Sequence, residues 1–166
     1  MSDRALRLSI LVLSVLGIGV AGYLTVAHFA HVQLACATGG CETVQRSRYA
    51  EFAGIPVATI GLVGFAVIAA TGVARSQLLR AIGFAAALTG FGVAMLLLYV
   101  QAAVLHAYCQ WCLTSDGILV LLVPLTFLRV EREAPLPAGS SRQVRRRAER
   151  DRARRAARRR PRRSVG

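Results

Sequence analysis

Charge is scarce over most of this 166-residue chain, and lysine is absent altogether. Residues 1–128 contain six arginines and four acidic residues, whereas residues 129–166 contain fifteen arginines and four acidic residues. Of the net charge of +13, +11 therefore belongs to a C-terminal tail, and the rest of the chain, at +2, is nearly neutral and strongly apolar. A soluble domain carries about 25% charged residues spread over its surface. The sequence excludes that class for residues 1–128.

Long apolar runs occupy the region that lacks charge. A bilayer core needs about 20 apolar residues per helix, and four runs meet this need: residues 8–30, 55–74, 81–105 and 109–128. The first run is longer than the 7–15 residues of a signal-peptide core, so we expect it to be retained. The sequence predicts an all-α membrane protein, in which residues 1–128 form a four-helix transmembrane bundle with a cysteine-containing outer loop between the first two helices.

The arginines indicate how this bundle is oriented. Basic residues are enriched in cytoplasmic loops. Arg4 and Arg7 precede the first run, Arg75 and Arg80 lie between the second and third, and the tail follows the fourth. If the chain crosses the membrane four times, all of these arginines lie on the same side of the membrane. We therefore expect both termini in the cytoplasm and the loop of residues 31–54 outside it.

The tail of residues 129–166 is predicted to be disordered, because a dense block of like charges repels itself and stays solvated. Basic residues near a membrane attract anionic lipid by about 1 kcal/mol each, so the anionic leaflet is the expected partner. Binding of nucleic acid is the alternative. The tail has no aromatic residues to stack on bases, which disfavours that alternative.

All four cysteines fall on the predicted outer side. Cys36 and Cys41 lie in the long loop, and Cys109 and Cys112 form Cys-Gln-Trp-Cys at the start of the fourth helix. Disulfides persist in oxidising compartments, and two close pairs are what two dithiol–disulfide couples require. A helix N-terminus also stabilises a thiolate, which is the species that attacks disulfides.

Two other interpretations of the cysteines remain open. The two pairs can be inert disulfides that staple the outer loop, or the four thiolates can bind zinc. An oxidising compartment disfavours zinc, because it removes the thiols first. The redox interpretation is favoured because a Cys-x-x-Cys at the mouth of a membrane helix is where a thiol can meet a lipid-soluble electron carrier.

The cysteines belong to a longer pattern. Cys36-x4-Cys41-x5-Ser47, then Gly54-Ile55-Pro56 before the second helix, and Cys109-x2-Cys112 at the fourth together resemble the vitamin K epoxide reductase family in its bacterial form. The resemblance covers residues 8–128. It implies an oxidoreductase of the bacterial cytoplasmic membrane that passes electrons from thiols to a quinone, menaquinone or ubiquinone, without a metal.

The resemblance also implies roles for individual residues. Cys109 and Cys112 would form the active couple, with Cys112 facing the quinone. Cys36 and Cys41 would shuttle electrons to that couple from a thioredoxin-fold partner in trans, so that the enzyme supports disulfide bond formation. Ser47 would lie beside the active couple and form a hydrogen bond within the loop.

Two departures from the family pattern concern the quinone pocket. Vertebrate members carry an asparagine near the start of the second helix, where this chain reads Pro56-Val57-Ala58-Thr59, so Thr59 is the candidate for a polar contact. Asp116 replaces a tyrosine and shares a helix face with Cys112. An acid inside a span is a functional candidate; the alternative is a first-turn acid that favours the helix dipole. Trp111, the only tryptophan, is a candidate for the pocket or for the aromatic belt.

Overall fold

The computed structural model describes residues 3–74, 76–132 and 145–150, and Arg75 and most of the predicted tail lie outside them. The chain divides into two units, Met1–Glu133 and Ala134–Gly166. In the second unit, residues 145–150 are helical. The first unit is mostly helical.

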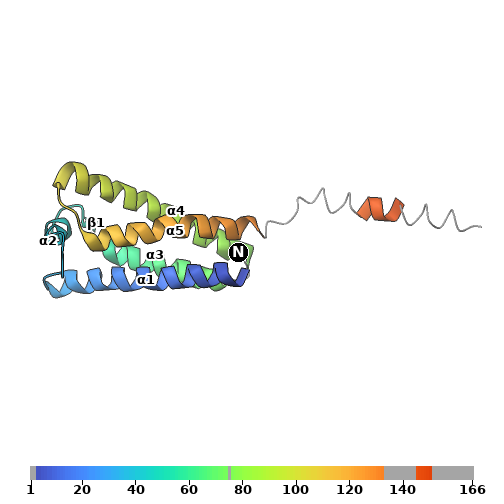
Figure 1. Cartoon of the computed structure of the whole chain (residues 1–166), viewed down its shortest axis with the longest axis horizontal. Coiled ribbons are helices and arrows are strands. Elements are labelled where there is room, and N and C mark those ends of the chain that lie inside the picture. Colours follow the sequence, from blue (N-terminus) through green and yellow to red (C-terminus); the bar gives the residue numbers. More distant parts are fainter. Residues whose placement is uncertain (1–2, 75, 133–144, 151–166) are drawn as a thin grey trace, which may run out of the picture. The chain divides into compact units, whose positions relative to one another are not determined.

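Four long helices make up the first unit (Figure 1): α1 is Asp3–Ala30, α3 is Val57–Val73, α4 is Gln77–Val100 and α5 is Gln110–Glu131. A π-helical turn, Gln101–Leu105, continues α4. Within the described residues, α1, α4 with its π-helical end, and α5 are long and apolar enough to cross a membrane. α3 is apolar but has 17 residues, so the fourth span stays a prediction.

Close approach of the helices depends on glycine. α1 packs against α3 and α5, and α4 packs against α3 and α5. A Cβ on Gly17 of α1 would lie 2.4 Å from the Phe65 ring of α3, and one on Gly83 of α4 would lie 2.3 Å from the Thr71 hydroxyl. Small residues let helix backbones approach closely inside a membrane, where the hydrophobic effect does not drive association.

A buried arginine closes one end of the bundle. Arg129 of α5 is 4% exposed and donates hydrogen bonds to the carbonyl oxygens of Thr71, Gly72 and Ala74. These are carbonyls at the C-terminus of α3, where the last turn leaves acceptors without helical partners and favours a cation. Arg129 therefore caps α3 from a different helix.

The opposite end carries the loop between α1 and α3. This loop contains α2, Cys41–Gln45, and a hairpin of β1, Glu51–Phe52, with β2, Ile55–Pro56. The predicted second helix is therefore wrong in its first two residues. Ala53 and Gly54 make the turn with positive φ, and Pro56 stands in extended conformation before α3. The all-α prediction missed this hairpin.

The cysteine-bearing segments and the helix ends rich in arginine lie at opposite ends of the bundle (Figure 1). α1 begins with Arg4 and Arg7, α4 begins near Arg80, and α5 ends at Arg129. The predicted separation of cysteines from these arginines is present in space. Which end faces the cytoplasm stays a prediction.

Candidate functional site

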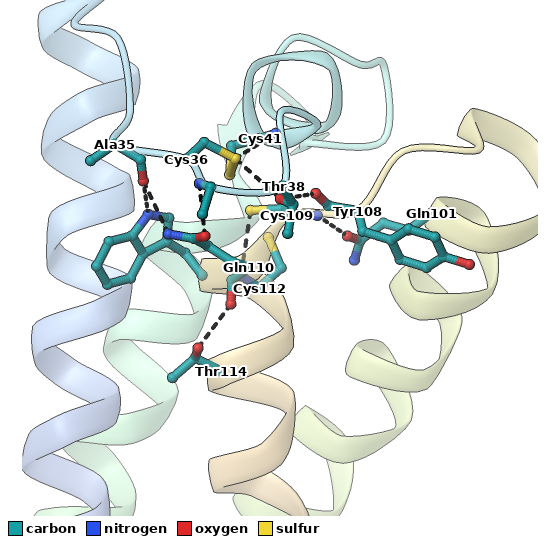
Figure 2. The surroundings of a disulfide bond; sticks show 12 residues. Ala35, Cys36, Thr38, Cys41, Gln101, Tyr108, Cys109, Gln110, Cys112 and Thr114 are labelled. Carbon is teal, nitrogen blue, oxygen red and sulfur yellow. Dashed lines mark hydrogen bonds between the residues drawn. A yellow bond between two sulfur atoms is a disulfide. The ribbon is translucent and has the colours of Figure 1, made fainter.

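The four cysteines meet at the end of the bundle that carries α2 (Figure 2). Cys36 and Cys41 form a disulfide, and Cys109 and Cys112 are free thiols. Cys41 and Cys109 are fully buried, whereas Cys36 and Cys112 are partly exposed. One disulfide and one dithiol therefore lie on adjacent segments.

The first turn of α5 holds the cysteine loop in place. Gln110 accepts a hydrogen bond from the Ala37 N–H at 2.9 Å and donates one to the Ala35 carbonyl at 3.2 Å (Figure 2). The Trp111 indole N–H donates to the same Ala35 carbonyl at 2.8 Å, and its ring lies 4.9 Å from that of Tyr23. The loop that carries one couple is thus bound to the helix that carries the other.

Two glycines serve this docking in different ways. Gly39 has a φ of +73°, a conformation that favours glycine, and makes the loop bend. Gly40 lies so close to the next segment that a Cβ would be 2.7 Å from the backbone nitrogen and oxygen of Tyr108. The Thr38 hydroxyl donates to the Tyr108 carbonyl at 2.7 Å. The backbone of the loop therefore lies directly on the segment before Cys109.

Cys109 stands immediately before α5 as its N-terminal cap. Its Sγ accepts a hydrogen bond from the Cys112 backbone N–H at 3.4 Å. The hydrogen bond from the Cys112 side chain lowers the pKa of Cys109, helped by backbone N–H groups and opposed by burial. These hydrogen bonds therefore stabilise the thiolate form of Cys109.

Gln101 is a site residue that the sequence did not single out. Its side-chain oxygen accepts a hydrogen bond from the Cys109 N–H at 2.8 Å, and the residue is 1% exposed (Figure 2). It is an amide within the apolar run of residues 81–105. Polar residues inside a membrane span are costly and are functional candidates by default. The position of Gln101 within this run was therefore the signal by which the sequence could have identified it.

A cavity of about 620 Å³ lies next to the dithiol, between α1, α3, α4 and α5 and below α2. Pockets of 300–1,000 Å³ hold small molecules in proteins. The lining is mostly apolar, and its polar side chains are few: Gln45, Ser47, Tyr49, Thr89, Gln101, Cys112, Ser115 and Asp116. The arrangement is an apolar chamber with one thiol of the couple in its wall.

The sequence model of the vitamin K epoxide reductase family matches residues 8–127, which hold all four cysteines, α3, α4 and most of α1 and α5. This chain belongs to that family. The family consists of membrane-integral thiol oxidoreductases that are associated with quinones and with thioredoxin-like partners. Membership therefore makes this protein a membrane thiol oxidoreductase in general terms.

Two of the four residues expected at the quinone pocket, Cys112 and Asp116, line the cavity. Ser47, which was expected beside the active couple, lines it as well. The Ser47 hydroxyl donates to the Val44 carbonyl at 2.7 Å, which is a hydrogen bond within the loop. One oxygen of Asp116, Oδ2, is buried and has no hydrogen-bond partner in the described part of the chain.

Two expected pocket residues are not part of the cavity lining. Trp111 faces the loop, because its N–H is bound to Ala35 and its ring packs against Tyr23. The Thr59 hydroxyl is buried without a hydrogen-bond partner among the described residues. A contact of Trp111 or Thr59 with the quinone therefore stays a prediction.

A metal site would need several ligands in one place. Within residues 3–74, 76–132 and 145–150, no group of three or more His, Cys, Asp or Glu side chains could hold a metal ion. In this structure Cys36 and Cys41 are bonded to each other, so those two sulfurs are not available as zinc ligands.

Proposed function

We propose that this protein oxidises a thioredoxin-fold partner outside the cytoplasm and passes the electrons to a membrane quinone, menaquinone or ubiquinone, in support of disulfide bond formation. The observation that carries the proposal is the position of the Cys109–Cys112 dithiol. It lies between the Cys36–Cys41 disulfide on one side and an apolar cavity on the other.

The membrane arrangement is part of the proposal. α1, α3, α4 and α5 all cross the bilayer of a bacterial cytoplasmic membrane, both termini lie in the cytoplasm, and the cysteines face outward. The 17 residues of α3 fall at the lower limit of a span, and β2 with Pro56 extends the chain before it. The arginines at the other end agree with the enrichment of basic residues in the cytoplasm.

Electrons would move inward in two exchanges. A dithiol of the partner reduces Cys36–Cys41, and the resulting loop dithiol reduces a Cys109–Cys112 disulfide; each exchange forms one disulfide for each one broken. The structure combines an oxidised loop couple with a reduced inner couple. That is the redox state expected after the second exchange and before the quinone is reduced.

The last step joins the inner couple to the quinone. Cys112, which lines the cavity, adds to the quinone ring, and the Cys109 sulfur then attacks the Cys112 sulfur and releases quinol. Two thiols lose two electrons and two protons to become a disulfide, and the quinone gains both to become quinol. The low pKa of Cys109 suits it to the second attack, which needs a thiolate.

Quinone reduction by the purified protein tests this function. We expect a short-chain quinone to be reduced when a reduced thioredoxin-fold protein is supplied. Cys109→Ala and Cys112→Ala should abolish this turnover. Cys36→Ala and Cys41→Ala should block it with the protein donor, while a small dithiol still reduces the inner couple. Full activity in all four variants would contradict the mechanism.

Thiol trapping separates this enzyme from the two structural alternatives. In an enzyme, the redox state of the cysteines follows added quinone and added partner. Cysteines of an inert staple would stay oxidised throughout, and cysteines of a metal site would resist alkylation until a chelator is added.

The Arg-rich tail is assigned a separate role in the proposal, at the anionic cytoplasmic leaflet. Because the first unit, Met1–Glu133, contains all four cysteines, deletion of residues 135–166 should leave quinone reduction intact. Weaker association of the truncated protein with anionic vesicles would show what the tail contributes to lipid binding.

A further inference from the structure

Within the part of the chain that the structure describes, one of the two polar atoms of the Gln101 amide has a hydrogen-bond partner and the other has none. The oxygen Oε1 accepts a hydrogen bond from the Cys109 N–H at 2.8 Å. The nitrogen Nε2 is buried and has no hydrogen-bond partner within the described residues. A buried donor left unsatisfied costs about 1–3 kcal/mol. In a residue that is 1% exposed, such a donor points to a ligand.

The direction of the amide is fixed by its partner. A backbone N–H can only donate, so the group that faces Cys109 must be the amide oxygen. The –NH2 group therefore lies on the other branch of the amide. Rotating the amide by half a turn would place its –NH2 group against the Cys109 N–H, so that two donors would face each other. The amide therefore keeps the orientation in which its oxygen faces Cys109.

A local irregularity at the end of α4 places Gln101 where its side chain can reach the backbone of Cys109. The last turn, Gln101–Leu105, is π-helical, and the Ala107 N–H donates to the Gln101 carbonyl at 3.1 Å. His106 then reverses the chain with a φ of 50°. These features bring Cys109 back against a side chain eight residues earlier. π-helical turns are rare and are frequently found at functional sites.

Gln101, which carries the unused donor, belongs to the cavity wall. Gln101, Cys112 and Asp116 line the same cavity, whose other walls are mainly apolar. An apolar ligand with a hydrogen-bond acceptor fits such a chamber, because the acceptor would satisfy the amide and the remainder would replace water against apolar side chains. A quinone ring has that chemistry, since its carbonyl oxygens are acceptors and the rest of the ring is apolar.

We propose that Gln101 donates a hydrogen bond from Nε2 to one carbonyl oxygen of the quinone, while its Oε1 holds the backbone of Cys109. This inference rests on the proposed function. One amide then fixes the ring relative to the active couple. Negative charge develops on the ring oxygen when the Cys112 sulfur adds, and hydrogen bonds to charged groups are about twice as strong as neutral ones. Gln101 therefore stabilises the transition state more than the bound quinone.

The Gln101→Met variant tests the donor, because methionine has nearly the same length and offers no N–H group. We expect KM for a short-chain ubiquinone or menaquinone to rise and kcat to fall, with kcat/KM reduced by about tenfold or more, as for the loss of about 1.4 kcal/mol. Gln101→Glu keeps an oxygen for the Cys109 N–H and removes the amide donor. It should also impair quinone reduction, and it serves as the second variant if Gln101→Met fails to fold.

The matched control is Thr114→Val on α5. Thr114 is exposed, its hydroxyl donates to the Gln110 carbonyl, and it is not part of the cavity lining. Its kinetic parameters should stay within about twofold of wild type. Gln45→Met is the competing variant, because Gln45 also lines the cavity and its Nε2 also lacks a hydrogen-bond partner among the residues that the structure describes.

A spectroscopic measurement separates a substrate contact from a structural role. With an isotope-labelled quinone bound, the infrared carbonyl stretch should show one hydrogen-bonded C=O in wild type. Gln101→Met should shift that band toward the free carbonyl. An unchanged band together with unchanged kcat/KM in Gln101→Met would overturn the inference, and so would loss of the band in Gln45→Met instead. Failure of the proposed function looks different, because the wild-type protein itself would not reduce quinone.

Discussion

The indole nitrogen of Trp111 donates a hydrogen bond to the carbonyl oxygen of Ala35 at 2.8 Å, across a sequence separation of 76 residues. Ala35 immediately precedes Cys36, and Trp111 lies between Cys109 and Cys112. One side chain within the inner Cys-x-x-Cys motif therefore helps to set the distance between the two redox couples.

Trp111→Phe should loosen this docking without removing the ring that packs against Tyr23. Loss of one hydrogen bond costs about 0.5–1.5 kcal/mol, so we expect amide hydrogen exchange in residues 35–41 to accelerate by about twofold to tenfold. Turnover with the protein donor should slow as well. Tyr99→Phe, at an exposed position, is the control. Unchanged exchange in the loop would show that the hydrogen bonds of Gln110 and Thr38 hold it without the indole.

Gly40→Ala should separate the loop from the segment before Cys109. The added Cβ would lie 2.7 Å from two backbone atoms of Tyr108, and backbone cannot move aside cheaply. Electron exchange between the loop couple and the inner couple should fall by about tenfold or more, as measured by thiol trapping after a pulse of reduced partner.

Gly39→Ala is the matched comparison for that variant. A Cβ on Gly39 meets no atom within 4 Å, but the φ of +73° strains any other residue. Such strain costs about 1–2 kcal/mol, so stability should drop while exchange between the couples is largely retained. Equal loss of exchange in both variants would mean that loop flexibility, and not close approach, controls the transfer.

The sequence was sufficient for the features that depend on local pattern. Apolar runs predicted the long helices to within a few residues, because helix formation in an apolar segment needs no knowledge of its neighbours. The segregation of arginines and cysteines to opposite ends followed from counting helices. Pro56 and the Ala53-Gly54 turn carried a signal for the β hairpin, which was overridden by the hydropathy of the run.

The features that depend on tertiary contact could not be predicted in this way. The orientation of Trp111 toward Ala35 depends on how the loop folds back over α5. The role of Gly40 depends on the backbone of Tyr108, and the role of Gln101 depends on a π-helical turn that brings Cys109 to it. Each of these joins segments far apart in sequence or departs from regular helix geometry.

The Cys109 thiol should titrate at a lower pH than an ordinary thiol. Its pKa is lowered, mainly by the hydrogen bond from the Cys112 side chain. Thiolate absorbance in the far ultraviolet should therefore rise with pH around a midpoint below the value of about 8.5 for an ordinary thiol. The fully reduced Cys36→Ala/Cys41→Ala double variant isolates this signal. Adding Cys112→Ala should move the midpoint upward, and a midpoint that stays in place would assign the shift to the helix N-terminus.

Arg129→Met should destabilise the bundle at the end away from the cysteines. The substitution leaves three carbonyl oxygens of the α3 C-terminus, those of Thr71, Gly72 and Ala74, without the buried guanidinium. Hydrogen bonds to charged groups contribute about 1.5–3 kcal/mol each, so thermal unfolding in detergent should occur several degrees lower. Arg4→Met, at an exposed position in the first turn of α1, should change it little. A similar loss in both variants would indicate a general effect of charge.

Asp116 is the acidic residue of the cavity wall, and we expect it to handle a proton during quinone reduction. Its Oδ2 is buried and without a partner among the described residues, and its position four residues after Cys112 puts both on one helix face. Asp116→Asn keeps the shape of the side chain and removes its ability to carry a proton. General acid–base catalysis contributes about 10²–10⁴-fold, so kcat for quinone reduction should fall by at least tenfold and its dependence on pH should flatten.

The comparison of kcat with KM decides what Asp116 does. A proton carrier affects kcat and the pH profile, whereas a group that only orients the ring would mainly raise KM. Asp3→Asn is the control, because Asp3 pairs with Arg7 at the far end of α1 and should leave both parameters unchanged. If Asp116→Asn reduces quinone at the wild-type rate with the same pH profile, the carboxyl has no part in the proton transfer. Its burial would then reflect its place near the N-terminus of α5, where the helix dipole favours an acid.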